Sequence, residues 1–147
     1  MRIAILGPTA SGKSSLAVAV AGHLGGTVVN GDPFQAIQGI PIGTGQPDAQ
    51  ERQGVPHVGY GCLPLSAPMN PADFGVRVRE WMQGLDPVVL VTGSGLYLRG
   101  IWEQLDELPA VPEEVVAQVR RWHAEAGAPV LHRRLAEVDP VRAAELH

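Results

Sequence analysis

The sequence predicts an α/β fold in which helices flank a parallel sheet. Short apolar runs rich in β-branched residues occur at residues 2–6, 27–30 and 87–91, and such runs are typical of buried parallel strands. Segments with helical periodicity, at 14–24 and 70–85, separate these runs. Strands that alternate with helices in this order form a parallel sheet with helices on its faces.

The segment between the first strand and the first helix fits the pattern G-x-x-x-x-G-K-[ST], the P-loop. It reads Gly7-Pro8-Thr9-Ala10-Ser11-Gly12-Lys13-Ser14. Its glycines let the backbone curl so that successive N–H groups point at one anion, and the following helix adds the positive end of its dipole. Lys13 supplies a mobile charge for a terminal phosphate, and Ser14 a hydroxyl ligand for Mg²⁺. The motif predicts a P-loop NTPase-like fold that binds phosphate, and it leaves the phosphate compound open.

Composition places the chain among globular domains. Its 147 residues are enough for one domain with a sizeable core, and 45% hydrophobic and 18% charged residues exclude a disordered chain. The single cysteine, Cys62, excludes an internal disulfide.

We find no signal peptide and no apolar run that could span a bilayer, so we expect a cytoplasmic protein without a membrane partner. A net charge of −4 gives no overall attraction to nucleic acid, so RNA binding must rest on local basic patches.

Polar side chains follow the second and third predicted strands. Asp32 stands directly after residues 27–30, at the carboxyl end of a parallel strand, and should face the same crevice as the P-loop. A capping carboxylate before Pro33 explains Asp32 equally well. Ser94 follows residues 87–91 in a second Gly-rich turn, which brings it and inward-facing N–H groups close to the site. On local grounds alone, a tight turn with a capping serine is the better explanation of Ser94.

The stretch between the second strand and the second long helix has little periodicity. We expect an ordered loop over residues 36–47, a helical turn over 48–53, and no regular structure from 55 to 68. Asn70 then caps a helix whose first residue is Pro71. The core-facing side chains predicted for the two long helices are Leu16, Ala17, Val20, Ala21 and Leu24 in the first, and Phe74, Val78, Trp81, Met82 and Leu85 in the second.

The C-terminal part of the chain is predicted to be helical. One helix ends at Gly127, a second runs over residues 129–137, and Asp139 caps the start of a third. We therefore divide the chain into a P-loop α/β core, residues 1–107, and the start of a helical insertion, residues 108–147, which is not an independent domain. The arginines of the insertion fit solvated helix faces and RNA phosphate contacts equally well.

Taken together, the motifs resemble one known family, the tRNA dimethylallyltransferases, also called tRNA isopentenyltransferases or IPP transferases. The P-loop and the motifs after it follow that family's order and approximate spacing. These later motifs are Asp32-x-x-Gln35, Ile42-Gly43-Thr44-x-x-Pro47, Val55-Pro56-His57, Ala72-Asp73-Phe74, Gly93-Ser94-Gly95-Leu96-Tyr97, Val138-Asp139-Pro140 and Leu146-His147. The resemblance runs along the whole chain, and the ordered set is far more specific than the P-loop alone.

The resemblance implies transfer of a dimethylallyl group from dimethylallyl diphosphate to N6 of the adenine on the 3′ side of the anticodon in tRNA. The P-loop is then expected to hold the diphosphate, with Mg²⁺ as cofactor and Ser14 as the metal ligand. Asp32 is the implied general base, Lys13 and Ser94 are the other implied catalytic residues, and the protein is expected to be a monomer. The implied diphosphate contacts are Gly7, Thr9, Ala10, Ser11, Gly12, Lys13 and Ser14, and the implied tRNA contacts are Asp32, Pro33, Phe34 and Gln35.

This chain departs from the family pattern at several places. Pro33 and Phe34 replace small polar residues, residues 36–38 replace Val-Tyr-Arg, and residues 92–94 replace Gly-Gly-Thr. Members of the family continue past the position of His147 with a stretch of diphosphate-neutralising arginines, so we expect a truncated chain. Two other interpretations stay open. One is a prenyltransferase acting on free adenylate, or a small-molecule P-loop kinase; the other is a catalytically inactive homologue that keeps only binding.

Overall fold

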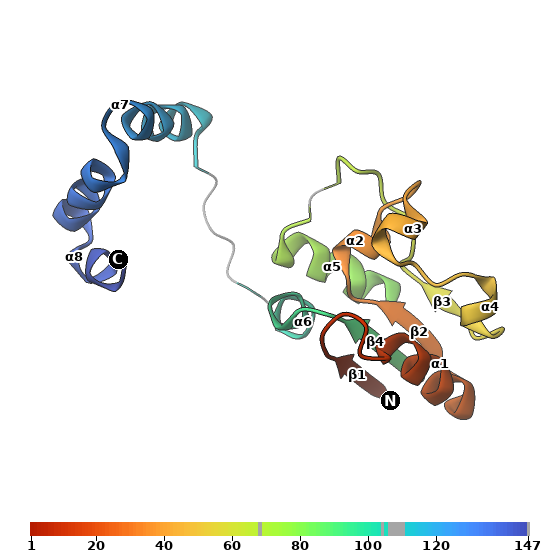
Figure 1. Ribbon diagram of the computed structural model, residues 1–147. Coiled ribbons are helices and arrows are strands. Elements are labelled where there is room, and N and C mark those ends of the chain that lie inside the picture. Colours follow the sequence, from red (N-terminus) through yellow and green to blue (C-terminus); the bar gives the residue numbers. More distant parts are fainter. Residues whose placement is uncertain (68, 104, 106–110, 147) are drawn as a thin grey trace. The chain divides into compact units, whose positions relative to one another are not determined.

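The computed structural model describes residues 1–67, 69–103, 105 and 111–146. The chain forms two compact units, Met1–Glu107 and Leu108–His147. The first unit contains a sheet with helices on both faces, and the second is helical (Figure 1). The boundary predicted between residues 107 and 108 falls within 106–110, which lies outside the described residues.

The sheet of the first unit has four parallel strands in the order β1-β4-β2-β3. Three of them, β1 (Arg2–Leu6), β2 (Thr27–Asn30) and β4 (Val88–Thr92), confirm the predicted strands. The fourth, β3 (His57–Val58), pairs with β2 and lies in the stretch from 55 to 68 that was predicted to be irregular. Two residues are too few to show a period, so this strand depends on its neighbour rather than on a local pattern.

Six helices belong to the first unit as described. They are α1 (Lys13–Leu24), α2 (Pro33–Ala36), α3 (Pro41–Thr44), α4 (Ala49–Arg52), α5 (Pro71–Trp81) and α6 (Gly95–Trp102). The start of α5 is confirmed, because the Asn70 side chain accepts a hydrogen bond from the Asp73 N–H at 2.9 Å. The prediction of a loop over 36–47 is wrong in part, since α3 forms there. This single turn starts at a proline and ends at Gly45 with φ 65°, so it needs no apolar period.

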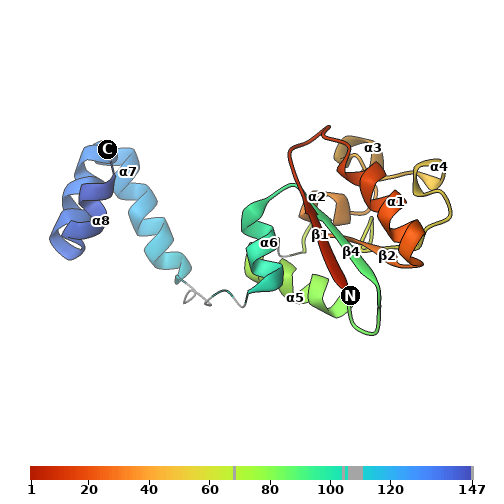
Figure 2. The same ribbon diagram turned by 90° about the horizontal axis from the view of Figure 1, so that it is seen from below.

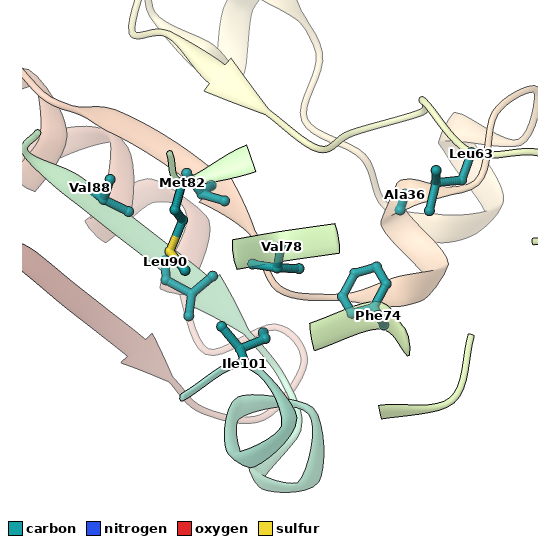
Figure 3. Close-up of a cluster of buried hydrophobic side chains, with 9 residues drawn as sticks. Ala36, Leu63, Phe74, Val78, Met82, Val88, Leu90 and Ile101 are labelled. Atoms are coloured by element: carbon teal, nitrogen blue, oxygen red, sulfur yellow. The ribbon is translucent and has the colours of Figure 1, made fainter. Parts of the chain in front are cut away.

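The core lies on both faces of the central strand β4, whose five residues are all buried. Helix α1 covers one face of the sheet, and α5 and α6 cover the other (Figure 2). On the second face, Phe74 and Val78 of α5 pack with Leu90 of β4 and Ile101 of α6 (Figure 3). The predicted core face of α5 is therefore confirmed, with Met82 also buried.

Two predictions about burial are wrong. Leu16 is 54% exposed, whereas Ala17 and Ala21 of the predicted face of α1 are buried, together with Val18, which was not predicted. Strand β1 was predicted to be buried, but its residues alternate between exposed and half-buried. Within the described residues, β1 stands at one end of the sheet and pairs with β4 alone. The sequence pattern of a strand does not reveal this position, because it depends on the order of strands in the sheet.

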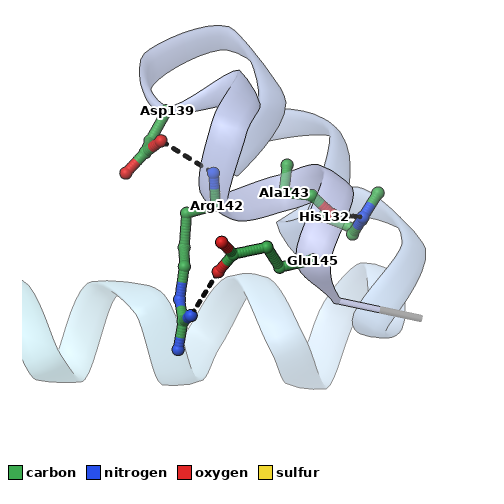
Figure 4. Close-up of polar contacts among 5 residues, drawn as sticks. All are labelled: His132, Asp139, Arg142, Ala143 and Glu145. Atoms are coloured by element: carbon green, nitrogen blue, oxygen red, sulfur yellow. Dashed lines mark hydrogen bonds and ion pairs between the residues drawn. The ribbon is translucent and has the colours of Figure 1, made fainter.

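The second unit consists of α7 (Glu113–Val138) and α8 (Pro140–Glu145). Gly127, with φ 72° and ψ 179°, breaks α7 where the first insertion helix was predicted to end. The start of the last helix is also confirmed, since Asp139 accepts a hydrogen bond from the Arg142 N–H at 2.9 Å. His132 contacts the Ala143 carbonyl oxygen at 2.9 Å and so joins the two helices (Figure 4). The motif at 146–147 ends on a residue outside those described.

Among the described helices, none combines the length and the apolar composition that crossing a bilayer requires.

Candidate active site

A cavity of about 240 Å³ opens where the first unit's parallel strands end. Four segments line it: the P-loop, the turn after β2, the end of α3, and the turn after β4. The lining residues are Thr9, Ala10, Lys13, Ser14, Asp32, Gln35, Thr44, Gly45, Val91, Thr92 and Gly93. The carboxyl ends of parallel strands meet at one edge of a sheet, which is why segments far apart in the sequence converge here.

The P-loop has the curled backbone that its motif predicts. Gly12 adopts φ 82° at the residue before α1, and Ala10 adopts φ 62°. A side chain at position 7 would meet the Ser11 hydroxyl oxygen at 3.2 Å, so glycine suits that position. The ammonium group of Lys13 donates a hydrogen bond to the Pro8 carbonyl oxygen. No acidic residue stands in the first turn of α1, so nothing there opposes an anion at the helix's amino end.

Asp32 serves two purposes that the sequence presented as alternatives. Its Oδ1 accepts a hydrogen bond from the Phe34 N–H at 2.9 Å and so caps α2. The same residue lines the cavity beside Lys13 and Ser14. Within the described residues, no hydrogen bond reaches its Oδ2, which leaves one carboxylate oxygen able to accept a proton from a bound compound.

The residues that follow Asp32 differ in what they can contact. Pro33 is buried as the first residue of α2, so it is packed inside rather than presented to a partner. Phe34 is 67% exposed. Gln35 lines the cavity, and its Nε2 donates to the Gly45 carbonyl oxygen at 2.8 Å. This bond joins α2 to the end of α3 and leaves the amide oxygen and one N–H of Gln35 for other partners.

Ser94 occupies the residue before α6 and is half-buried. Its side chain makes no capping hydrogen bond, so the capping role favoured on local grounds is wrong. Its N–H donates to the Thr92 hydroxyl oxygen at 3.3 Å. Thr92 and Gly93 line the cavity, whereas Ser94, like Gly7, Ser11 and Gly12 of the P-loop, lies outside the lining.

Sequence reasoning gave no role to several residues that shape this site. Thr44 and Gly45 line the cavity, and the motif at 42–47 was the available signal for them. Asn30 and Thr92 are fully buried, and Thr92 also lines the cavity. The position of Asn30 at the end of an apolar run was the available signal for its role, because a buried side-chain amide needs hydrogen-bond partners.

The carboxylate of Asp32 also influences two nearby phenols. Burial raises the pKa of Tyr60, and the negative charge of Asp32 adds to that rise. The pKa of Tyr97 is raised by burial first and by Asp32 second. The Tyr97 hydroxyl donates to the Met69 carbonyl oxygen at 2.6 Å. Both phenols therefore stay protonated at neutral pH.

Fold and cavity together define a class: an α/β P-loop protein in which the anion-binding loop shares its cavity with a carboxylate and an amide side chain. Comparison with family models narrows this class. A model described as "IPP transferase" matches residues 35–147, and one described as "Isopentenyl transferase" matches residues 1–59. The chain belongs to the IPP transferase family.

Individual relatives agree with the family models. A tRNA dimethylallyltransferase of Rhodospirillum centenum is 45% identical over 146 residues, which cover 96% of this chain and 46% of the relative. The tRNA dimethylallyltransferase of Granulibacter bethesdensis is 44% identical over 147 residues, which cover 97% of this chain and 46% of the relative. The chain thus spans about half the length of the curated relatives it matches.

Solved structures carry the same fold. The full-length tRNA isopentenylpyrophosphate transferase of Bacillus halodurans superposes with a TM-score of 0.62 at 31% identity, covering 99% of this chain and 50% of that one. A eukaryotic dimethylallyltransferase, described as acting on tRNA, gives a TM-score of 0.70 at 25% identity, covering 99% of this chain and 38% of its own.

Proposed function

We propose that the protein transfers a dimethylallyl group from dimethylallyl diphosphate to the exocyclic N6 amine of the adenine on the 3′ side of the anticodon in tRNA. One observation carries the proposal: a single cavity joins Lys13 and Ser14 of the P-loop to the carboxylate of Asp32. Prenyl transfer to an amine needs an anion-binding site for the leaving group and a proton acceptor beside it. The names of the relatives supply the substrate class.

The P-loop is proposed to bind the diphosphate through main-chain N–H groups over residues 7–14 and through Lys13. The ammonium of Lys13 leaves the Pro8 carbonyl and neutralises charge that grows on the diphosphate as the C–O bond breaks. The oxygen donors fit Mg²⁺, which prefers hard oxygen ligands and keeps several waters, and the Ser14 hydroxyl is its proposed protein ligand. When bound, the ion adds positive charge beside the diphosphate.

Asp32 is proposed to take the proton that N6 must lose. The bond between the allylic carbon and oxygen breaks, diphosphate leaves with the electron pair, and a bond forms between that carbon and N6. The proton on N6 then passes to the free oxygen of the Asp32 carboxylate. The amide of Gln35 keeps a donor and an acceptor for an adenine edge, and Ser94 is proposed to act near the bridging oxygen.

Partner and location follow from the same proposal. The target adenine must leave its stack to reach the cavity, and the exposed ring of Phe34 is a surface on which a nucleobase can stack. The protein is also proposed to act in the cytoplasm, on tRNA, and as a monomer. Free adenylate is the competing acceptor, because the P-loop and Asp32 suit both.

Transfer of labelled dimethylallyl from its diphosphate to unmodified tRNA, and to AMP in parallel, tests the proposal. We expect label on tRNA, and we expect Asp32→Asn to lower transfer by about a hundredfold or more, since general bases contribute that much. Diphosphate binding should survive, because the substitution preserves the cap on Phe34. Asp48→Asn, which also preserves a helix cap, is the matched control and should transfer normally.

Two results would contradict this proposal. Label on AMP alone would identify an adenylate prenyltransferase. Diphosphate binding without transfer to either acceptor would identify a family scaffold that has lost its chemistry.

A further inference from the structure

In the described part of the chain, two polar side chains are fully buried, Asn30 at 0% exposed and Thr92 at 1%. They come from different strands, β2 and β4, yet both bind the turn that carries Asp32. Buried polar groups cost stability unless they are hydrogen-bonded, so their partners indicate what they are for. Neither side chain belongs to the catalytic set proposed above.

Asn30 holds the main chain of Asp32 from both sides. Its Oδ1 accepts a hydrogen bond from the Asp32 N–H at 2.8 Å, and its Nδ2 donates to the Asp32 carbonyl oxygen at 2.8 Å. The second hydrogen of the amide goes to the Gly59 carbonyl oxygen, also at 2.8 Å. The amide thus fixes both peptide groups that flank the Cα of Asp32, and it ties them to the segment after β3.

Thr92 connects this turn to the one after β4. Its hydroxyl donates to the Gly31 carbonyl oxygen at 2.8 Å and accepts from the Ser94 N–H at 3.3 Å. The Gly31 N–H donates to the Val91 carbonyl oxygen at 2.7 Å. The fit is close, because a Cβ on Gly31 would lie 3.0 Å from the Cβ of Thr92. The Thr92 hydroxyl and this main-chain bond therefore set the spacing between the turns that carry Asp32 and Ser94.

We propose that Asn30 and Thr92 are positioning residues that hold the Asp32 and Ser94 turns in one fixed arrangement before substrate arrives. The inference rests on the proposed function, since it assigns Asp32 the role of base. We call these two side chains and their hydrogen bonds the clamp. A displacement of about 1 Å can slow a reaction between positioned groups by about a hundredfold, so the clamp should control kcat. The P-loop lies outside the clamp, because neither side chain bonds to residues 7–14.

The decisive variant is Thr92→Val, which keeps shape and removes the hydroxyl. We expect kcat for transfer to fall about tenfold or more. KM for dimethylallyl diphosphate and Kd for Mg²⁺-diphosphate should change by less than about twofold, because the variant leaves ground-state binding intact. Thr92→Ser restores the hydroxyl and should restore kcat. Thr27→Val makes the same chemical change on β2, away from the turns, and serves as the matched control.

Three outcomes overturn the clamp. Undiminished kcat in Thr92→Val shows that the hydroxyl positions nothing. A raised KM with unchanged kcat shows that Thr92 touches substrate instead. Loss of kcat together with diphosphate affinity shows a general structural role.

A wild-type protein without transfer activity would defeat the proposed function and leave the clamp measurable by amide hydrogen exchange. Thr92→Val should then speed exchange at Ser94 and Asp32 about tenfold relative to α1. Unchanged exchange at both amides would refute the clamp separately.

Discussion

Two loops meet at the site, and they are held in opposite ways. The P-loop, residues 7–14, is mostly exposed, and its shape rests on positive φ angles at Ala10 and Gly12. Its one side-chain hydrogen bond to main chain joins Lys13 to Pro8. The segment of residues 30–32 begins with the last residue of β2, Asn30, which is buried. Its main chain forms hydrogen bonds with the side chains of Asn30 and Thr92. The strands that precede the two loops flank the same central strand, β4.

The difference fits the role proposed for each loop. A loop that binds an anion needs its N–H groups free, so its own side chains cannot occupy them, and the ligand completes its hydrogen bonding. A carboxylate that removes a proton must already point the right way when the substrate arrives, so its main chain is fixed from within. We therefore expect the P-loop to depend on its ligand and the proposed base, Asp32, to depend on the core.

The largest expected effect tests the support of the base. Asn30→Ala removes three hydrogen bonds and leaves their partners unpaired, one of them buried and two part-buried, so the free energy of unfolding should fall by about 3 kcal/mol. Urea denaturation monitored by tryptophan fluorescence measures it. Asn70→Ala is the matched control, since this exposed asparagine caps α5 and bonds the Asp73 carboxylate at the surface, and its loss should cost about 1 kcal/mol. Equal losses in the two variants would mean that burial of Asn30 adds nothing.

The next largest effect is a loss of ligand affinity with little change in stability. Lys13→Met should weaken Mg²⁺-diphosphate binding by about 2 kcal/mol, roughly thirtyfold, because a charged hydrogen-bond donor is lost. The free energy of unfolding should stay within about 0.5 kcal/mol, since the side chain is not part of the core. Calorimetric titration measures the first and urea denaturation the second. Lys13 is the single lysine of the sequence, so diphosphate should also protect it from an amine-reactive reagent. Unaltered reactivity with bound diphosphate would remove Lys13 from the site.

A third prediction places the same substitution in both loops. Gly31→Ala puts a methyl group 3.0 Å from the Val91 carbonyl oxygen, and this crowding should cost about 2 kcal/mol of stability. A Cβ at position 12 would meet no atom within 4 Å. Gly12→Ala should therefore lower stability only through the strain of φ 82°, by about 1 kcal/mol. Thermal denaturation compares the two, and Gly12→Ala alone should also weaken diphosphate binding. A larger stability loss at position 12 would reverse the comparison.

Much of this architecture can be predicted from the sequence, because periodicity is local. The three longer strands and the two long helices were readable from their apolar patterns, and the P-loop from its spacing. The exposure of Leu16 and of β1 was not, since it depends on which elements lie beside each other. Strand β3 and helix α3 are too short to have a period at all.

The residues of the site differ in the same way in how far the sequence predicts them. Lys13, Ser14, Asp32 and Gln35 stand in motifs, and each lines the cavity. The bonds that support the turn of Asp32 were hidden, because Thr92 reaches a carbonyl 61 residues away and Asn30 one 29 residues away. A motif identifies the groups that face a ligand, whereas the groups behind them are chosen by packing, which a single sequence does not display.

The smallest expected effect concerns pH and separates the loops once more. Burial lowers the pKa of His57 below its ordinary value of 6.5, Arg52 lowers it further, and the Val55 carbonyl opposes them. The unfolded chain therefore binds a proton more readily than the folded one, and stability should fall as pH drops from 6.5 through the lowered pKa. His57 belongs to β3 and contacts the Tyr60 ring, next to the Gly59 carbonyl that Asn30 binds.

Protonation of His57 should thus loosen the support of the base and spare the P-loop. Amide exchange at about pH 7.5 and about pH 5.5, corrected for intrinsic rates, should show faster opening near Asp32 at the lower pH and no change in α1. The effect is small because the ring is partly exposed. His57→Gln should abolish it, with His23→Gln, at an exposed position of α1, as control. If the pH dependence persisted in His57→Gln, protonation of another group would be responsible for the faster opening of the turn that carries Asp32.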